Sequence, residues 1–151
     1  MSIKCDIKGI QQVESALKDK LKDFLNNPKA LRAGVFENAK YPDGLFVAQN
    51  AFWHEYGTLK IPMRPFMRNA YAKNKAKWVR FFVSQCKGTL DFDLAMQRTG
   101  EIMRGDIIKS LMDIQPPNTA STIRAKKSSK PLIDTGFLRQ SISFEVRKQN
   151  A

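Results

Sequence analysis

The chain has 151 residues, of which 42% are hydrophobic and 10% aromatic, so it fits one ordinary domain with a buried core and excludes a disordered chain. Its 26 Lys and Arg residues outnumber its 14 Asp and Glu residues, which gives a net charge of +12. No apolar run approaches the ~18–20 residues that a membrane-spanning helix requires, and the first residues lack the apolar core of a secretory signal. We therefore expect a single domain over residues 1–151 without membrane contact.

The N-terminal part of the chain predicts a helix and then a hairpin. Apolar residues recur there at spacings of three and four, which places them on one helix face, and Pro28 stops that helix. Residues 31–36 and 45–47 predict two strands, joined through a turn at residues 41–44 that contains Pro42 and Gly44. Residues 48–56 fit a short helix, with Gly57 as its left-handed cap. The apolar face of the first helix consists of Ile10, Val13, Leu17, Leu21 and Leu25.

The middle of the chain predicts two long helices. Pro62 and Pro65 keep residues 61–66 extended, and a helix follows over residues 68–87. A second helix is predicted over residues 91–113, in which Gly100 and Gly105 are expected to mark close packing against another helix. The expected core faces are Met67, Tyr71, Trp78 and Phe82 on the first helix, and Met96, Met103, Ile107, Leu111 and Ile114 on the second.

The C-terminal part predicts a loop and a strand. Pro116 and Pro117 break the second long helix, and the polar stretch after them predicts a mobile basic loop at about residues 116–131. Residues 141–147 alternate polar and apolar side chains, which predicts a half-buried strand. We expect an α+β domain, in which a small antiparallel sheet (the hairpin plus this strand) packs against the two long helices and the N-terminal helix.

The sequence has little equipment for catalysis. The only His is His54, which excludes sites that need two or three, and position 58 holds Thr where a zinc metalloprotease motif needs its second His. Cys5 and Cys86 lack CxxC spacing and favour two free thiols in a reducing compartment. Glycine-rich phosphate loops do not occur in the sequence. We therefore expect a protein that is not an enzyme and that holds no metal or cofactor.

Positive charge is concentrated in two segments. Residues 64–87 contain seven basic residues and no acidic residue, and residues 115–151 contain seven basic and two acidic residues. Such segments attract phosphate or an acidic protein surface, although a solvated face without a partner fits the same pattern. The candidate phosphate-facing residues are Lys73, Lys77, Arg80, Lys87, Arg124, Lys126, Lys127 and Lys130.

Three stretches of the sequence carry a family resemblance. They are YPDG at residues 41–44 with Val47-Ala48, HEYGT at residues 54–58 with IPMRPFMR at residues 61–68, and PLIDTGFLRQSI at residues 131–142. In this order they resemble the tail-completion (neck) and virion-morphogenesis proteins of tailed bacteriophages and of Mu-like or lambdoid prophages, which include the lambda minor tail protein Z group. The resemblance covers about residues 31–148, and Met63 stands where the family often has a small residue.

The resemblance implies a structural protein of the virion without catalytic activity. Such proteins form a homo-oligomeric ring, for which the resemblance suggests six copies, that joins the tail to the DNA-filled head. The implied partners are further copies of the chain, head–tail connector proteins, tail terminator or tube proteins, and the genomic DNA that passes through the ring. The implied location is the neck or tail of the virion, after assembly in the cytoplasm of the host bacterium.

The same motifs supply the residues expected at an oligomer or partner interface. Two prolines stiffen the loop, so less conformational entropy is lost when it docks, and Arg64 and Phe66 are residue types that are enriched at interface hot spots. The turn at residues 134–136 is expected to hold Leu138 and the last strand in register. Alternatively, both motifs serve only the fold of the monomer. The candidate set is His54, Glu55, Tyr56, Pro62, Arg64, Pro65, Phe66, Arg68, Asp134, Leu138 and Arg139.

A second function is compatible with the charge pattern, namely a basic module that binds DNA without sequence preference. The basic stripe of the helix at residues 68–87 would follow a phosphate backbone. Tyr71, Trp78 and Phe82 fall on a different face and are expected in the core rather than stacked on bases. Salt distinguishes the two functions, because a phosphate binder loses affinity steeply between ~50 and 200 mM salt.

Overall fold

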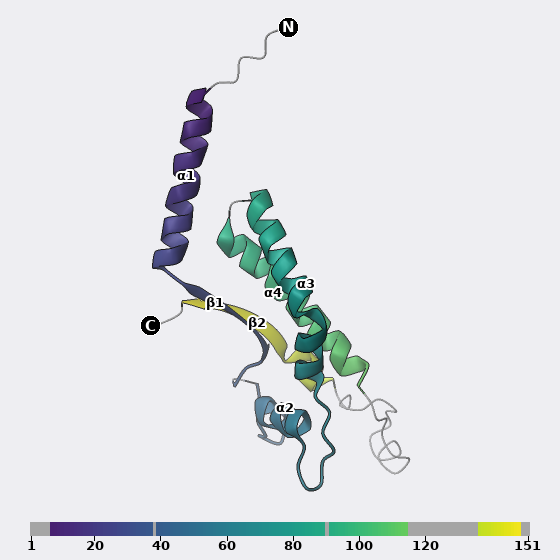
Figure 1. The fold of residues 1–151 in the computed structure, drawn as a ribbon. Helices are drawn as coiled ribbons and strands as arrows, with labels where there is room; N and C mark the ends of the chain where they lie inside the picture. The colour runs from purple at the N-terminus through teal and green to yellow at the C-terminus, as the bar shows by residue number, and fades with distance from the viewer. Residues whose placement is uncertain (1–6, 38, 90, 115–135, 149–151) are drawn as a thin grey trace.

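The computed structural model describes residues 7–37, 39–89, 91–114 and 136–148. The α+β class that the sequence predicts is confirmed, and Figure 1 shows an antiparallel pair of strands beside two long helices. The elements in chain order are α1 (Ile7–Asn26), β1 (Lys29–Val35), α2 (Val47–Tyr56), α3 (Phe66–Thr89), α4 (Phe92–Met112), α6 (Phe137–Gln140) and β2 (Ile142–Lys148).

The sheet of the described residues pairs the two ends of the domain. β1 and β2 are antiparallel, with Lys29 opposite Lys148 and Val35 opposite Ile142. Both strands contact α4, which packs along α3 to form a helical hairpin. The predicted C-terminal strand is therefore confirmed, and it closes the fold by pairing with a strand more than 100 residues earlier in the chain.

The predicted hairpin is wrong in its second strand. Residues 45–47 form no strand, and Phe46 takes part only in an isolated bridge with Lys40. The amide of Leu45 donates to the Asp43 carboxylate at 3.1 Å, and the amide of Tyr41 donates to the carbonyl of Leu45 at 2.9 Å. This tight turn leads directly into α2, whose first residue, Val47, is fully buried. Within the apolar run that suggested a strand, Val47 is the first residue of α2, and Leu45 and Phe46 precede the helix.

The two long helices supply most of the core, as the sequence predicts. On α4 the apolar side chains of Met96, Ile107 and Leu111 are buried, and Asp91 caps the helix by accepting from the amide of Leu94 at 3.0 Å. On α3, Phe66 and Trp78 are buried, but Tyr71 is exposed, so its predicted place in the core is wrong. The remaining members of the core cluster lie on α2, α3, α6 and β2 and just after α4, and are Val47, Ala51, Ala70, Ile114, Leu138 and Ile142.

Gly100 marks a close approach, although to a strand rather than to a helix. A Cβ atom at Gly100 would lie 2.2 Å from Cδ2 of Phe144, on β2. At Gly105 a Cβ atom would meet nothing within 4 Å. The predicted helix contact is therefore wrong at both glycines, and only Gly100 is required by packing.

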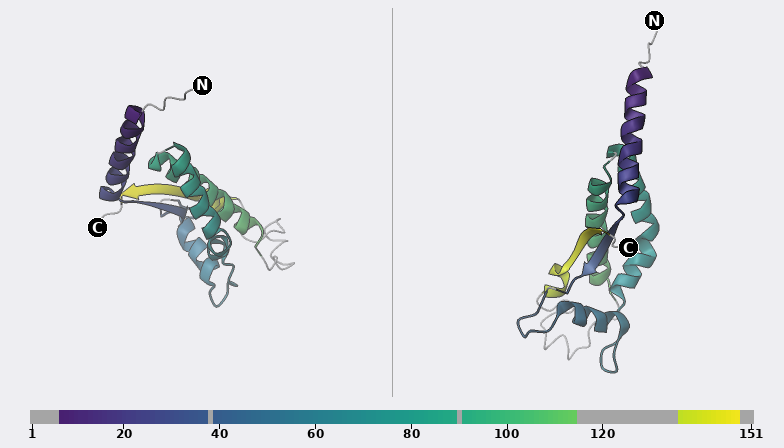
Figure 2. Two further views of the ribbon diagram at one scale, coloured as in Figure 1. Left: turned by 45° about the horizontal axis from the view of Figure 1, so that its top comes forward. Right: turned by 90° about the vertical axis from the view of Figure 1, so that its left-hand side faces the viewer.

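α1 extends away from the rest of the described chain in all three views (Figures 1 and 2). Its base is fixed by a stacked ring pair, Phe24 and Phe92, with centroids 4.7 Å apart, and by an ion pair of Lys29 with Asp93 just after the helix. Leu17, Leu21 and Leu25 are exposed, the last of them by 67%. The predicted packing of this helix on the sheet is not observed. Within the described residues, no helix has the length and apolar character needed to cross a membrane.

Candidate functional site

The segment between α2 and α3 projects from one end of the molecule as a loop (Figures 1 and 2). Gly57 ends α2 with a φ of 76°, and its amide donates to the carbonyl of Trp53 at 2.8 Å. A Cβ atom at Gly57 would lie 3.2 Å from the Cβ of Met63, across the loop. Both the backbone conformation and the narrow space at this position therefore favour glycine. The predicted capping position is confirmed, but the ψ of 166° places Gly57 outside the left-handed helical conformation that the sequence predicted.

Hydrogen bonds within the loop hold its shape. The amide of Thr58 donates to the carbonyl of Ile61 at 2.9 Å, and the Thr58 hydroxyl accepts from the amide of Ile61 at 3.0 Å. At the base of the loop, the amide of Arg64 donates to the carbonyl of His54 at 2.6 Å. Leu59 lies at the tip with its side chain fully exposed. Because the loop is ordered by its own bonds, it would lose little conformational entropy on docking.

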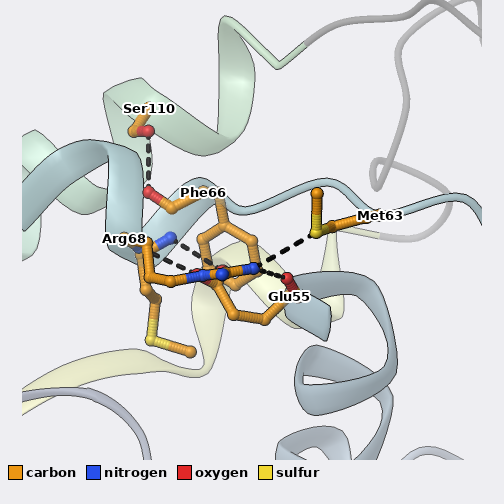
Figure 3. Close-up of polar contacts among 6 residues, drawn as sticks. Glu55, Met63, Phe66, Arg68 and Ser110 are labelled. Atoms are coloured by element: carbon orange, nitrogen blue, oxygen red, sulfur yellow. Dashed lines mark hydrogen bonds and ion pairs between the residues drawn. The ribbon is translucent and has the colours of Figure 1, made fainter. Parts of the chain in front are cut away.

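Glu55 connects α2 to the start of α3 (Figure 3). Its side chain is only 3% exposed, and its carboxylate accepts from the amides of Met67 and Arg68 at 3.0 and 2.9 Å. The same carboxylate accepts from Nε of Arg68 at 3.1 Å. The two amides belong to the first turn of α3, where backbone donors have no partner within the helix, so a carboxylate there satisfies the donors and the helix dipole together.

Phe66 is anchored in the core beside this carboxylate. Its side chain is fully buried, and its carbonyl accepts from the Ser110 hydroxyl at 2.7 Å, which links α3 to α4 (Figure 3). Glu55 and Phe66 were both candidates for an interface. Their side chains are buried within their own chain, where they support the fold.

The outward side of this region carries four exposed apolar side chains. The rings of Phe52 and Tyr56 lie 4.7 Å apart, and the guanidinium of Arg68 lies 4.9 Å from the Tyr56 centroid. Nη2 of Arg68 also donates to Sδ of Met63 at 3.4 Å, which joins the rings to the loop. We call this surface the loop patch, defined by Phe52, Tyr56, Leu59 and Met63.

Sequence reasoning found only Tyr56 of the loop patch. Phe52 and Met63 follow ordinary apolar patterns and give no sign of exposure. Leu59 does give a signal, because it is an apolar residue in a turn, between Thr58 and Lys60. Of the other predicted residues, Pro62 is exposed, whereas His54, Arg64 and Pro65 are half-buried around the base of the loop.

The described part of the third motif, residues 136–142, packs against α2. The short helix α6 follows Gly136, which has a φ of 79°, and places Leu138 in the same buried cluster as Val47. The rings of Tyr41 and Phe137 are 5.8 Å apart, and α6 contacts α2. The motifs that carry the resemblance therefore meet in space although they are far apart in the sequence. Leu138 is buried and Arg139 exposed, and Asp134 lies outside the described residues.

The basic stripe of α3 is exposed, but one of its members is engaged within the chain. Lys77 donates to the Asp106 carboxylate at 2.8 Å, and Nε1 of Trp78 donates to the same carboxylate at 2.7 Å. Lys73, Arg80 and Lys87 are exposed on the same helix. The predicted basic loop at residues 116–131, with Arg124, Lys126, Lys127 and Lys130, lies outside the described residues.

Reactive groups are sparse in the part of the chain that the structure describes. No group of three or more His, Cys, Asp or Glu residues there is arranged to hold a metal ion. Cys86 is a free thiol in that part, and burial raises its pKa, which lowers the fraction of reactive thiolate at neutral pH.

A scan against protein-family models and searches of curated proteins and of solved structures find no significant match to this chain.

Proposed function

We propose that this chain is a structural virion protein of a tailed phage or prophage, a tail-completion (neck) component that joins the tail to the DNA-filled head as part of a homo-oligomeric ring. The proposal starts from the resemblance of the three motifs. It is carried by one observation, namely that these motifs form a single unit whose buried side fixes the fold and whose outer side is the loop patch.

The geometry of that unit supports a contact with another protein. Glu55 and Arg68 fix the junction of α2 with α3, so the loop patch is presented on a rigid base. The loop patch holds the aromatic rings of Phe52 and Tyr56 beside the guanidinium of Arg68, and aromatic and arginine side chains are enriched at the energetic centres of protein interfaces. In a ring of the neck, such a surface would contact a connector or a tail terminator protein.

Electron microscopy of lysates from the source phage or prophage tests the proposal. With this gene deleted, we expect DNA-filled heads beside detached or overlong tails, because the two parts of the virion are no longer joined. Intact, infectious virions from the deletion would overturn the proposal.

Complementation of the deletion tests the loop patch itself. Leu59→Asp places a charge at a fully exposed tip, so it leaves the fold intact while it disrupts an apolar contact. We expect this variant to leave heads and tails unjoined. Met112→Asp is the matched control, since it makes the same change at an exposed residue of α4 outside the loop patch, and it should restore virions. Restoration by Leu59→Asp would place the joining contact elsewhere on the chain.

A basic DNA-binding module is the second candidate, favoured by the exposure of Lys73, Arg80 and Lys87 on one helix. It predicts an affinity for duplex DNA that falls steeply with salt and that the double variant Lys73→Glu/Arg80→Glu weakens at every DNA sequence. A neck protein need not bind DNA in isolation. DNA binding together with intact virions from the deletion would favour this second function.

A further inference from the structure

The described residues expose two apolar surfaces besides the loop patch. The first is the outer face of α1, on which Leu17, Leu21 and Leu25 are exposed. We call it the arm. The second is an open apolar groove, whose walls come from α3, α4 and β1. We call it the groove, and it is lined chiefly by Leu31, Tyr71, Trp78, Val79, Phe82 and Met96.

We propose that the arm of one copy of this chain docks in the groove of the next copy, and that this contact joins the copies of the ring. The inference deepens the proposed function and rests on it for the ring. The contact itself is a property of the chain in solution, so it can be tested without the virion.

The arm is short enough to lie along the groove. From Leu17 to Leu25 the arm rises about 12 Å, at ~1.5 Å per helical residue. From Tyr71 to Phe82 the groove follows α3 for about 17 Å by the same rise. A helix that inserts residues at spacings of four into an apolar groove is a common mode of protein recognition. The loop of another copy, which presents the single exposed side chain of Leu59 at its tip, would contact only a small part of the groove.

Charge disfavours the simplest alternative, in which two grooves face each other. Residues 66–89, which form α3, carry six basic residues and no acidic residue, so a symmetric contact would bring two strongly positive helices together. The described half of α1 is nearly neutral, because Lys18, Lys20 and Lys22 are offset by Asp19 and Asp23. The arm is therefore a better occupant of the groove than a second α3.

The base of α1 directs the arm outward. The stack of Phe24 on Phe92 and the ion pair of Lys29 with Asp93 hold the C-terminal end of α1 at the start of α4. From there the helix extends beyond the remainder of the described chain (Figure 2). Because the arm and the groove are different surfaces, their contact is heterologous, and repetition of such a contact closes a ring when the rotation between copies allows it.

Two variants and their mixture test this contact in the purified chain. Leu21→Asp disables the arm, and Val79→Asp disables the groove at a residue that is 63% exposed. By light scattering after size exclusion, we expect the wild type to form closed oligomers and each variant to have the mass of one chain. The equimolar mixture should form dimers only, because it retains one intact arm and one intact groove. Met112→Asp is the control and should assemble like the wild type.

Each other outcome overturns the proposal. A monomeric wild type would mean that another protein covers both surfaces, and a monomeric mixture would mean that the two surfaces do not meet. Far-UV circular dichroism spectra of both variants that match the wild type exclude unfolding as the cause, whereas melting temperatures would differ because association stabilises the wild type.

Cysteine pairs show whether the contact lies within one chain or between two. In a Cys5→Ser/Cys86→Ser background, Leu21→Cys and Val79→Cys on separate chains should give covalent dimers on mild oxidation. The double variant Leu21→Cys/Val79→Cys should give covalently linked oligomers of several chains rather than a disulfide within one chain, and a disulfide within one chain would overturn the proposal. If these tests fail while the gene deletion still leaves heads and tails unjoined, the arm-and-groove contact is wrong and the neck function stands.

Discussion

At the scale of single residues, Glu55 is expected to stabilise the fold more than its partner Arg68. Glu55→Ala removes the acceptor of two amides at the start of α3, and each unsatisfied buried donor costs about 1–3 kcal/mol. Arg68→Ala removes a half-exposed member of an ion pair and should cost no more than about 1 kcal/mol. Urea denaturation of both variants measures the difference. Equal losses in the free energy of unfolding would show that Glu55 stabilises the fold through its ion pair with Arg68 rather than through the two amides.

Two glycines of α4 give a matched pair of predictions with opposite signs. Gly100→Ala places a methyl group 2.2 Å from the ring of Phe144, so it should lower the free energy of unfolding by roughly 1–3 kcal/mol despite better helix propensity. Gly105→Ala meets nothing within 4 Å and should stabilise the chain by up to about 1 kcal/mol. Thermal melts of both variants are the measurement. A stabilised Gly100→Ala would mean that Phe144 moves aside at little cost.

At the scale of elements, the sequence predicted the helices and strands whose bounds are marked by nearby residues, such as a capping side chain or a proline. The predicted helix at residues 91–113 is observed as α4, which begins after Asp91, whose side chain caps it, and ends before Pro116 and Pro117. The error at residues 45–47 arose because a short apolar run fits a strand and the start of a buried helix equally well. The amphipathic pattern of α1 predicted a helix with one apolar face, but no pattern within one sequence says which molecule covers that face.

The sequence predicted which segments form the candidate site, but not which of their side chains are buried and which are exposed. The HEYGT and IPMRPFMR stretches fall where the structure has its projecting loop, yet sequence gave Glu55 and Phe66 the same standing as Tyr56. Their burial depends on contacts with Ser110 and with the amides of α3, which no local spacing reveals. The groove was missed because Tyr71 shares the spacing of buried residues such as Trp78, although it is exposed.

α1 is expected to contribute little to the stability of the rest of the domain. None of its described side chains, those of residues 15–26, belongs to the core cluster, and its described ring contact with α4 is the stack of Phe24 on Phe92, worth about 0.5–1.5 kcal/mol beyond the area it buries. Deletion of residues 1–22 retains that stack, so the shortened chain should unfold within about 1 kcal/mol of the full chain in urea, at a protein concentration low enough for both to be monomeric. Self-association should be lost in the same variant. A large loss of stability would show that the arm packs on its own chain in solution.

At the scale of the whole molecule, net charge and apolar surface act in opposite directions. Two copies of a chain with a net charge of +12 repel each other, whereas the proposed contact between them is apolar. Added salt shortens the screening length from about 10 Å at 0.1 M to about 3 Å at 1 M, which weakens the repulsion and leaves the apolar contact intact. Self-association should therefore strengthen as salt is added, and sedimentation velocity at several salt concentrations measures this directly.

The sign of that salt dependence separates the two candidate functions, because a contact with phosphate weakens under the same change. Lys73→Glu/Arg80→Glu is the matched test, since two charge reversals lower the net charge from +12 to about +8 at exposed positions of α3. This variant should associate more tightly than the wild type at low salt and equally at high salt, since only the repulsion differs between them. If the wild-type chain instead dissociates as salt is added, attraction between charges joins its copies, and the groove is not the surface that holds them.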